Sequence, residues 1–232
     1  MLISYTHNFI FFHVAKVAGT SMREALKDYT REPDKFRIAR PPKMIEDKPN
    51  PLYEMWFSFL WHAKARDAEK YLPSEVYHDS YKFAFVRNPW DWQVSMYNFM
   101  VKEKIYAETR PWVTFEEYLD WVAITDRPYA KGATKLQKDI ITDRNGKIMV
   151  DFIGRYENLS QDFQSVCDRL QIKATLPHFN QSSRTKQDYR TYYNEKTKSI
   201  VAEIFQEDIQ LFGYDFDNEN ADLQTLAISS GL

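Results

Sequence analysis

Apolar positions along this chain fall into two recurring patterns, short uninterrupted runs and stripes at helical spacing. One run covers residues 8–14 and a second covers 81–87, and both are rich in phenylalanine. Runs of this length without polar gaps predict buried strands. Each is followed by a short junction and then by a predicted helix, over 22–29 in the first case and from Pro89 to about Lys104 in the second. The unit of strand, junction and helix therefore occurs twice.

Further helices are predicted where apolar residues return every three or four positions. The predicted segments are 63–72, which ends before Pro73, then 114–124, 159–170 and 200–212, which ends at Gly213.

Turn-forming residues mark the remaining segments. Asn145 and Gly146, between apolar residues 140–141 and 148–153, predict a β-hairpin. Prolines within 31–51 exclude a long regular element and predict an irregular excursion. Residues 55–60 form a candidate strand.

Alternating strands and helices predict an α/β sandwich with a mostly parallel central sheet. Ligands of such sheets bind at the carboxyl ends of the strands, where both junctions fall. A length of 232 residues predicts a single domain, which we place over 1–216. Residues 217–232 are polar and then small, which predicts a flexible C-terminal tail.

Composition narrows the classes of function. With 44% hydrophobic residues the chain is globular, and a net charge of −2 gives no general attraction to nucleic acid. The single cysteine, Cys167, excludes an intrachain disulfide and favours a reducing compartment. No Cys/His metal cluster is expected, and the apolar run at 9–14 is too short to span a membrane. We therefore expect a soluble cytoplasmic protein.

The first junction, Lys16-Val-Ala-Gly-Thr-Ser21, has the residues of an anion-binding loop. The backbone N–H groups around Ala18 and Gly19 would face the ligand at the start of a helix, where the dipole is positive. Gly19 would permit an unusual backbone angle and a close approach of the ligand. Thr20 and Ser21 offer hydroxyl donors and Lys16 a positive charge. The order of a nucleotide triphosphatase loop is absent, and the loop by itself is equally compatible with a plain helix cap.

The second junction ends a strand with Arg87 and places Ser95 eight positions further on, about two helical turns away. An arginine there can hold a second phosphate with two parallel hydrogen bonds, and the serine can add a hydroxyl. A surface arginine and a packed serine are the alternative.

These motifs carry a resemblance to a known family. Residues 11–21 resemble the 5′-phosphosulfate-binding loop of sulfotransferases that use 3′-phosphoadenosine 5′-phosphosulfate (PAPS), specifically the carbohydrate, Golgi-type branch. Residues 83–95 resemble the 3′-phosphate-binding strand and helix of that family. Residues 152–159, 176–180 and 208–214 continue the similarity, which extends from Phe9 to Phe216. It implies a P-loop-like three-layer sandwich.

The sequence departs from the family at three of these positions. Ala15 and Val17 stand where relatives commonly have proline and threonine, which should alter the rigidity of the loop. Trp92 stands where relatives often have a basic residue, so a phosphate or acceptor contact is in question there.

The resemblance implies transfer of a sulfuryl group from PAPS to a hydroxyl of a carbohydrate or similar acceptor, without a metal ion. It implies that Lys16 stabilises the leaving 5′-phosphate and that His62 is the general base. A histidine packed against Trp61 and a carboxylate base are the alternatives for that role. Arg184 is a candidate to close over the adenosine or its 3′-phosphate.

Two other functions stay open at this point. One is a nucleotide or small-molecule kinase, which would need magnesium, and the other is a catalytically silent nucleotide-binding module on the same fold. The resemblance also leaves open a Golgi lumenal location, if this chain is a fragment of a longer anchored protein.

Overall fold

The computed structural model describes residues 1–30, 62–103, 110–129, 133–177 and 188–217, with the short strands 44–45, 48–49 and 226–227. Apart from these strands, the predicted excursion at 31–51, the candidate strand at 55–60 and the segment around Arg184 lie outside the described residues.

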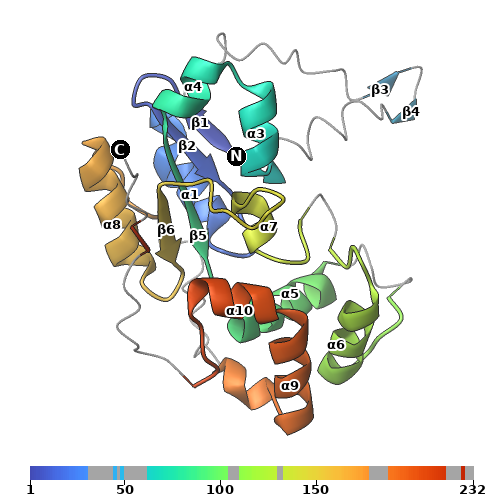
Figure 1. The fold of residues 1–232 in the computed structure, drawn as a ribbon. Helices are drawn as coiled ribbons and strands as arrows, with labels where there is room; N and C mark the ends of the chain where they lie inside the picture. Colours follow the sequence, from blue (N-terminus) through green and yellow to red (C-terminus); the bar gives the residue numbers. More distant parts are fainter. Residues whose placement is uncertain are drawn as a thin grey trace.

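A mixed sheet with a parallel centre forms the middle of the fold (Figure 1). In the order β1-β2-β5-β6-β7, the two inner pairings are parallel and the two outer pairings antiparallel. The strands are β1 (Leu2–Ser4), β2 (Phe9–Phe12), β5 (Tyr81–Val86), β6 (Phe152–Arg155) and β7 (Leu226–Ala227). The predicted mostly parallel sheet is confirmed, and the outer strands β1 and β7 are additional to it. A separate pair, β3 (Met44–Ile45) and β4 (Lys48–Pro49), is antiparallel.

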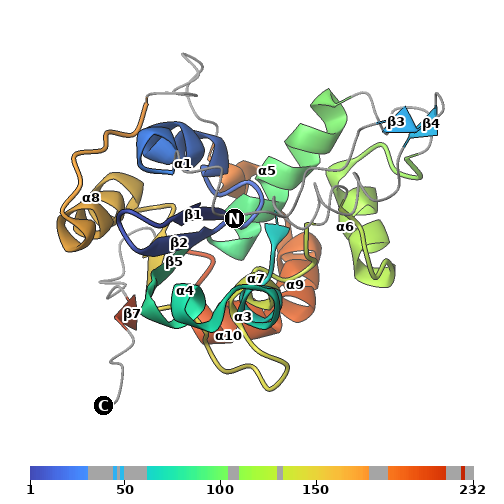
Figure 2. The same cartoon turned by 90° about the horizontal axis from the view of Figure 1, so that it is seen from above.

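Helices cover both faces of this sheet (Figure 2). On one side lie α1 (Gly19–Leu26) and α8 (Leu159–Leu170), and on the other α3 (Ala65–Tyr71) and α4 (Ser74–Asp79). The short helix α7 (Lys138–Ile141) packs against α3. The three-layer α/β sandwich predicted from the sequence is confirmed.

A further group of helices lies beyond the carboxyl end of β5 (Figure 1). It consists of α5 (Pro89–Lys102), α6 (Phe115–Ile124), α9 (Glu195–Ile204) and α10 (Gln206–Phe212). Short 3₁₀ turns cover Lys27–Tyr29 and Tyr189–Tyr192.

Local sequence explains why these elements form. Strands β2 and β5 carry Phe9, Phe11, Phe83 and Phe85, all buried, because a sheet covered on both faces needs apolar side chains on both. Asn88 caps α5, and its side chain accepts a hydrogen bond from the backbone N–H of Trp90 at 3.0 Å.

The predicted hairpin at 140–153 is wrong in its first arm. The turn itself forms, with Gly146 at a φ of 82° and the Asp143 N–H donating to the Lys147 carbonyl at 2.9 Å. However, residues 138–141 are the helix α7, and only one isolated bridge joins Thr142 to Ile148. The helical turn forms here because the carboxylate of Asp208 caps its first N–H groups, those of Gln137 and Lys138.

The apolar stripe at 200–212 forms two helices, α9 and α10, that meet at Phe205. The Phe205 ring is fully buried and lies edge-on to Trp92, with ring centroids 5.8 Å apart. Gly213 ends α10 in the left-handed conformation, as predicted. Within the segment predicted as a tail, Leu226 and Ala227 pair with β6, and the boundary at residue 216 stays a prediction.

Candidate functional site

The two junctions lie side by side at one edge of the sheet. Strands β2 and β5 are parallel neighbours in which Phe12 pairs with Ala84, so both chains leave the sheet at the same end. A guanidinium N–H of Arg87 donates to the Lys16 carbonyl at 3.3 Å. The indole N–H of Trp92 donates to the Ala15 carbonyl at 2.7 Å. Residues 71 and 77 positions apart in sequence therefore form one structure.

The loop backbone is shaped to bind an anion. Lys16 and Ala18 have left-handed φ angles of 60° and 51°, which turn successive N–H groups toward one side. Among the described residues, no protein acceptor binds a backbone N–H between Lys16 and Ser21. The loop carbonyls, in contrast, are held by Arg87 and Trp92. Unpaired N–H groups at the start of a helix are donors of the kind that phosphates bind.

Gly19 has a different role from the one predicted. Its φ is not positive, so the expectation of an unusual backbone angle is wrong at this position and applies to Lys16 and Ala18 instead. A Cβ at residue 19 would lie 1.7 Å from Nε2 of His13. The imidazole of His13, which is 6% exposed, therefore occupies the space that a side chain at 19 would need.

Arg87 is a buried arginine and not a surface one. Its Nε and one terminal nitrogen both contact Oδ2 of Asp91 at 2.7 Å, and the guanidinium lies 4.1 Å from the ring centre of Tyr156. With the bond to Lys16, three of its five N–H donors are used. Two donors remain for a ligand, and Asp91 fixes the plane in which they lie.

The Lys16 side chain lies over the face of α5 that carries Ser95 and Phe99. The Lys16 Nζ lies 4.4 Å from the ring centre of Phe99, which is one helical turn beyond Ser95. Both Lys16 and Ser95 are half-buried. Burial, followed by the nearby positive charge of Arg87, lowers the pKa of Lys16. The structure records no contact between Ser95 and Arg87 among the described residues, and Ser95 lies one helical turn before Phe99, the residue that Lys16 contacts.

His62 contacts the strand that leads into the loop. Its Nδ1 lies 3.1 Å from the His13 carbonyl oxygen, and the two imidazole centres are 4.9 Å apart. Burial is the largest cause that lowers the pKa of His62 to about 4, against the opposing effect of that hydrogen bond. The ring is therefore neutral at pH 7. Because a carbonyl only accepts, Nδ1 carries the proton and Nε2 is left as an acceptor, the state that a general base requires.

The carboxylates near Arg87 are already engaged. Asp91 binds Arg87, and Glu157 accepts from the Asn88 N–H at 2.7 Å and from the Tyr214 hydroxyl at 3.0 Å. This distribution favours His62 over either carboxylate as the base.

Two buried residues at this edge were missed by the sequence analysis. The Gln137 side chain binds the backbone of Arg87, and Asp208 binds the backbone of Gln137. Gln137 lies in no recognised motif. Asp208 begins the stretch 208–214 that continues the family resemblance, but that resemblance gives it no role, and its burial and contacts in the folded chain reveal it.

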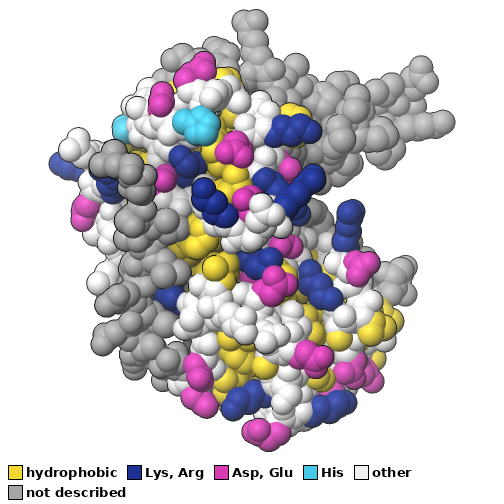
Figure 3. Space-filling view, in the orientation of Figure 1, with side chains coloured by type: hydrophobic (Ala, Val, Ile, Leu, Met, Phe, Trp, Pro, Cys, Tyr) yellow, Lys and Arg dark blue, Asp and Glu magenta, His cyan; other side chains and the backbone are white. Residues whose placement is uncertain are grey.

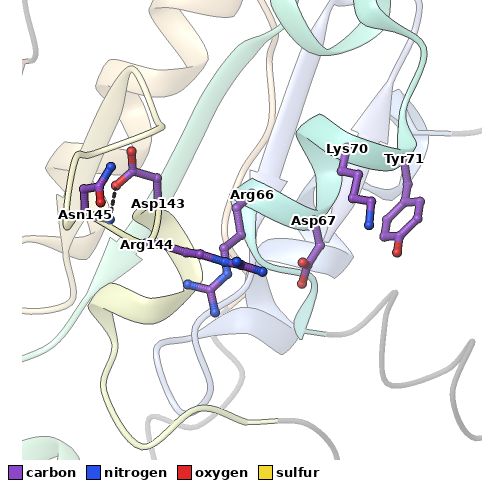
Figure 4. A pocket seen from close by; sticks show the side chains of 7 residues that line it. All are labelled: Arg66, Asp67, Lys70, Tyr71, Asp143, Arg144 and Asn145. Atoms are coloured by element: carbon purple, nitrogen blue, oxygen red, sulfur yellow. Dashed lines mark hydrogen bonds between the residues drawn. The ribbon is translucent and has the colours of Figure 1, made fainter.

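A cavity of about 340 Å³ opens between α3 and the 143–146 turn (Figure 4). Arg66, which lines this cavity, is four residues after His62 along the chain. The other lining residues are Asp67, Lys70, Tyr71, Asp143, Arg144 and Asn145. Figure 3 shows Lys and Arg side chains together with Asp and Glu on the middle of this face.

Neither a metal cluster nor a membrane helix is found in the described parts of the chain. No group of three or more His, Cys, Asp and Glu residues there is placed to hold a metal ion. None of the described helices is both long and apolar enough to cross a bilayer.

Comparisons with known proteins place the chain in a family. Neither the curated proteins nor the solved structures contain a match to it. A family model described as "Sulfotransferase family" matches residues 1–215, which include β2, the Lys16 loop, Arg87 and His62. The chain therefore belongs to the sulfotransferase family, an enzyme family that uses PAPS as its donor.

Proposed function

We propose that this protein transfers the sulfuryl group of PAPS to a hydroxyl of a carbohydrate or similar acceptor and releases adenosine 3′,5′-bisphosphate. The observation that carries the proposal is the contact between the two junctions, in which Arg87 binds the Lys16 carbonyl. It gives one edge of the sheet two separate sites for anions. PAPS has two separate phosphates to fill them.

The residues present fit the donor. The free N–H groups from Lys16 to Ser21 suit the 5′-phosphosulfate, and the two remaining donors of Arg87 suit the 3′-phosphate. Thr20 and Ser21 lie in the first turn of α1, where their hydroxyls add to the cradle of the 5′-phosphate. The half-buried Ser95 is a further donor on the stripe of α5 that faces Lys16.

When bound, PAPS supplies a sulfuryl group that an acceptor oxygen attacks, with cleavage of the bond between sulfur and the 5′-phosphate oxygen. Lys16 and the loop N–H groups stabilise the negative charge left on the 5′-phosphate. His62 takes the acceptor proton at Nε2, and its Nδ1 bond to the His13 carbonyl orients the ring. Each role uses a group that the structure holds at this edge.

The carbohydrate acceptor is proposed from the sequence resemblance, and the cavity between α3 and the 143–146 turn is compatible with it. This cavity combines charged and amide side chains with Tyr71, a residue that is 62% exposed. Exposed aromatic rings and polar groups together suit a hydroxylated ligand.

Calorimetric titration with adenosine 3′,5′-bisphosphate, without magnesium and beside ATP, tests the donor site. We expect micromolar binding of the bisphosphate, loss of binding in a Lys16→Ala, Arg87→Ala double variant, and much weaker binding of ATP. Thr6→Ala, on an exposed turn, is the control. A preference for ATP with magnesium would favour a kinase.

Transfer is tested separately with labelled PAPS and a panel of hydroxylated saccharides. We expect His62→Ala to bind the bisphosphate like the wild type and to lose transfer, because a base is not needed to hold the donor. Loss of binding as well would refute the assignment of His62. A wild type that binds the bisphosphate but sulfates no acceptor would be a silent binding module.

A further inference from the structure

Arg87 lies one residue beyond the end of β5, where the sheet no longer holds its backbone. The Val86 carbonyl still accepts from the Tyr156 N–H, on the side of β6. The backbone N–H and carbonyl of Arg87 point the opposite way, because the backbone polar groups of successive strand residues alternate in direction. On that side β2 has already ended at Phe12 and the chain has left to form the loop.

The side-chain amide of Gln137 binds both backbone groups of Arg87. Its Oε1 accepts from the Arg87 N–H at 2.9 Å, and its Nε2 donates to the Arg87 carbonyl at 2.8 Å. An amide carries one acceptor and two donors, so it can replace a missing strand at this position. The Gln137 side chain is fully buried, and water cannot take over these bonds.

Gln137 is in turn held by Asp208 on α10. Oδ2 of Asp208 accepts from the Gln137 N–H at 2.8 Å, and Oδ1 accepts from the Lys138 N–H at 2.9 Å. Asp208 is also fully buried. An unbroken series of buried hydrogen bonds thus runs from α10 through the start of α7 to the end of β5.

We propose that Gln137 is a positioning residue that fixes Arg87 for the 3′-phosphate of the donor, and that Asp208 fixes Gln137. This inference rests on the proposed function. The Arg87 guanidinium is already bound to Asp91 and to the Lys16 carbonyl, so only its backbone can still shift the direction of its two remaining donors. Gln137 holds that backbone at both of its polar groups.

The test compares two nucleotides that differ only in the 3′-phosphate, adenosine 3′,5′-bisphosphate and adenosine 5′-monophosphate. In the wild type, the ratio of their dissociation constants measures the contribution of the 3′-phosphate. We expect Gln137→Ala to weaken binding of the bisphosphate by about 10- to 100-fold, the size of one or two charge-assisted hydrogen bonds. The dissociation constant of the monophosphate should change little, so the ratio should fall toward the ratio measured for Arg87→Ala.

A merely structural role would not change this ratio, because partial unfolding reduces the active fraction for both nucleotides equally. Gln137→Glu is the second variant, since it keeps the shape and the acceptor for the Arg87 N–H but loses the donor. We expect the ratio for Gln137→Glu to lie between those of the wild type and Gln137→Ala. The matched control is Gln164→Ala, an exposed glutamine on α8 that binds Asp168.

The outcomes separate the two proposals. A wild type without preference for the bisphosphate would refute the proposed function itself. A wild type with the preference, together with an unchanged ratio in Gln137→Ala or Gln137→Glu, would overturn the positioning role alone.

Discussion

The indole N–H of Trp92 donates a hydrogen bond of 2.7 Å to the carbonyl oxygen of Ala15, so a buried ring on α5 holds the start of the loop at residues 16–21. Trp92 is 1% exposed and packs edge-on against Tyr129 and Phe205. Relatives often have a basic residue here according to the sequence resemblance. In this chain the position contributes to the shape of the loop and brings no charge to the site.

Trp92→Phe should therefore weaken the loop. The variant leaves the Ala15 carbonyl without its donor, which costs about 1–3 kcal/mol when a group is buried. We expect a lower free energy of unfolding in urea and weaker binding of the bisphosphate by calorimetry. Trp121→Phe, at a half-buried position on α6, is the control. Unchanged bisphosphate binding in Trp92→Phe would show that the loop keeps its shape without this bond.

Gly19→Ala should destabilise the protein through contact with His13. The added methyl group would overlap the imidazole, and overpacking of this kind costs about 1–3 kcal/mol. In the double variant with His13→Ala, the cost of the methyl group should largely disappear, which a double-mutant cycle of urea unfolding measures. Ala18→Gly is a useful contrast, because it should relieve about 1 kcal/mol of left-handed strain. Simple additivity of the changes at 13 and 19 would contradict this account.

His62 should stay neutral well below the pH at which histidine usually gains its proton. Because its pKa is lowered to about 4, its contribution to stability is present at neutral pH and is lost as the pH falls from about 6.5 toward 4. NMR titration of the imidazole, assigned with His62→Gln, measures this directly. Addition of the bisphosphate should raise the pKa, since negative charge nearby favours the protonated ring. A midpoint near 6.5 in the free protein would contradict the burial of this ring.

Asp208 should make stability fall as the pH rises from about 4 to 7. Burial raises its pKa to about 7, although the Gln137 and Lys138 N–H groups oppose the shift. The folded state therefore binds the proton more tightly than the unfolded state, and each unit of pKa is worth about 1.4 kcal/mol.

Other charged groups face Asp208, and the measurement has to separate them. Lys138 and Asp139 act on it from α7, Glu207 pairs with Lys138 from α10, and the Tyr129 hydroxyl group is close enough to be affected. The difference in unfolding free energy between the wild type and Asp208→Asn should shrink from pH 4 to 7 and level off above. A constant difference would show that Asp208 does not titrate in this range.

The parts of the fold that could be predicted from sequence are those set by local chemistry. The phenylalanine-rich runs specify β2 and β5 because both faces of these strands are buried, and Asn88 with Pro89 specifies the start of α5. Gly213 marks a left-handed helix end for the same reason, since no side chain opposes that conformation.

The rest depends on partners distant in the chain. An Asn-Gly turn at 145–146 indicates a hairpin. However, Asp208 caps the N–H groups of residues 137 and 138, and residues 138–141 before the turn are therefore helical. Position 19 likewise requires a glycine because the ring of His13, six positions earlier and outside α1, occupies the space that a side chain would need. Lys16, Arg87 and His62 are predicted as site residues from their motifs, and their roles stay predictions. Gln137 could not be predicted in this way, because what singles it out is its contact with the backbone of Arg87, 50 positions away in sequence.

His13 joins the two sides of the site, since its ring packs on Gly19 and its carbonyl holds His62. A ligand that shifts the loop can therefore act on the imidazole of His62 through His13. Linkage of this kind is reciprocal: if the bound donor changes the affinity for an acceptor by some factor, the acceptor changes the affinity for the donor by the same factor. We expect the two substrates to bind cooperatively, with one histidine as the mechanical connection between them.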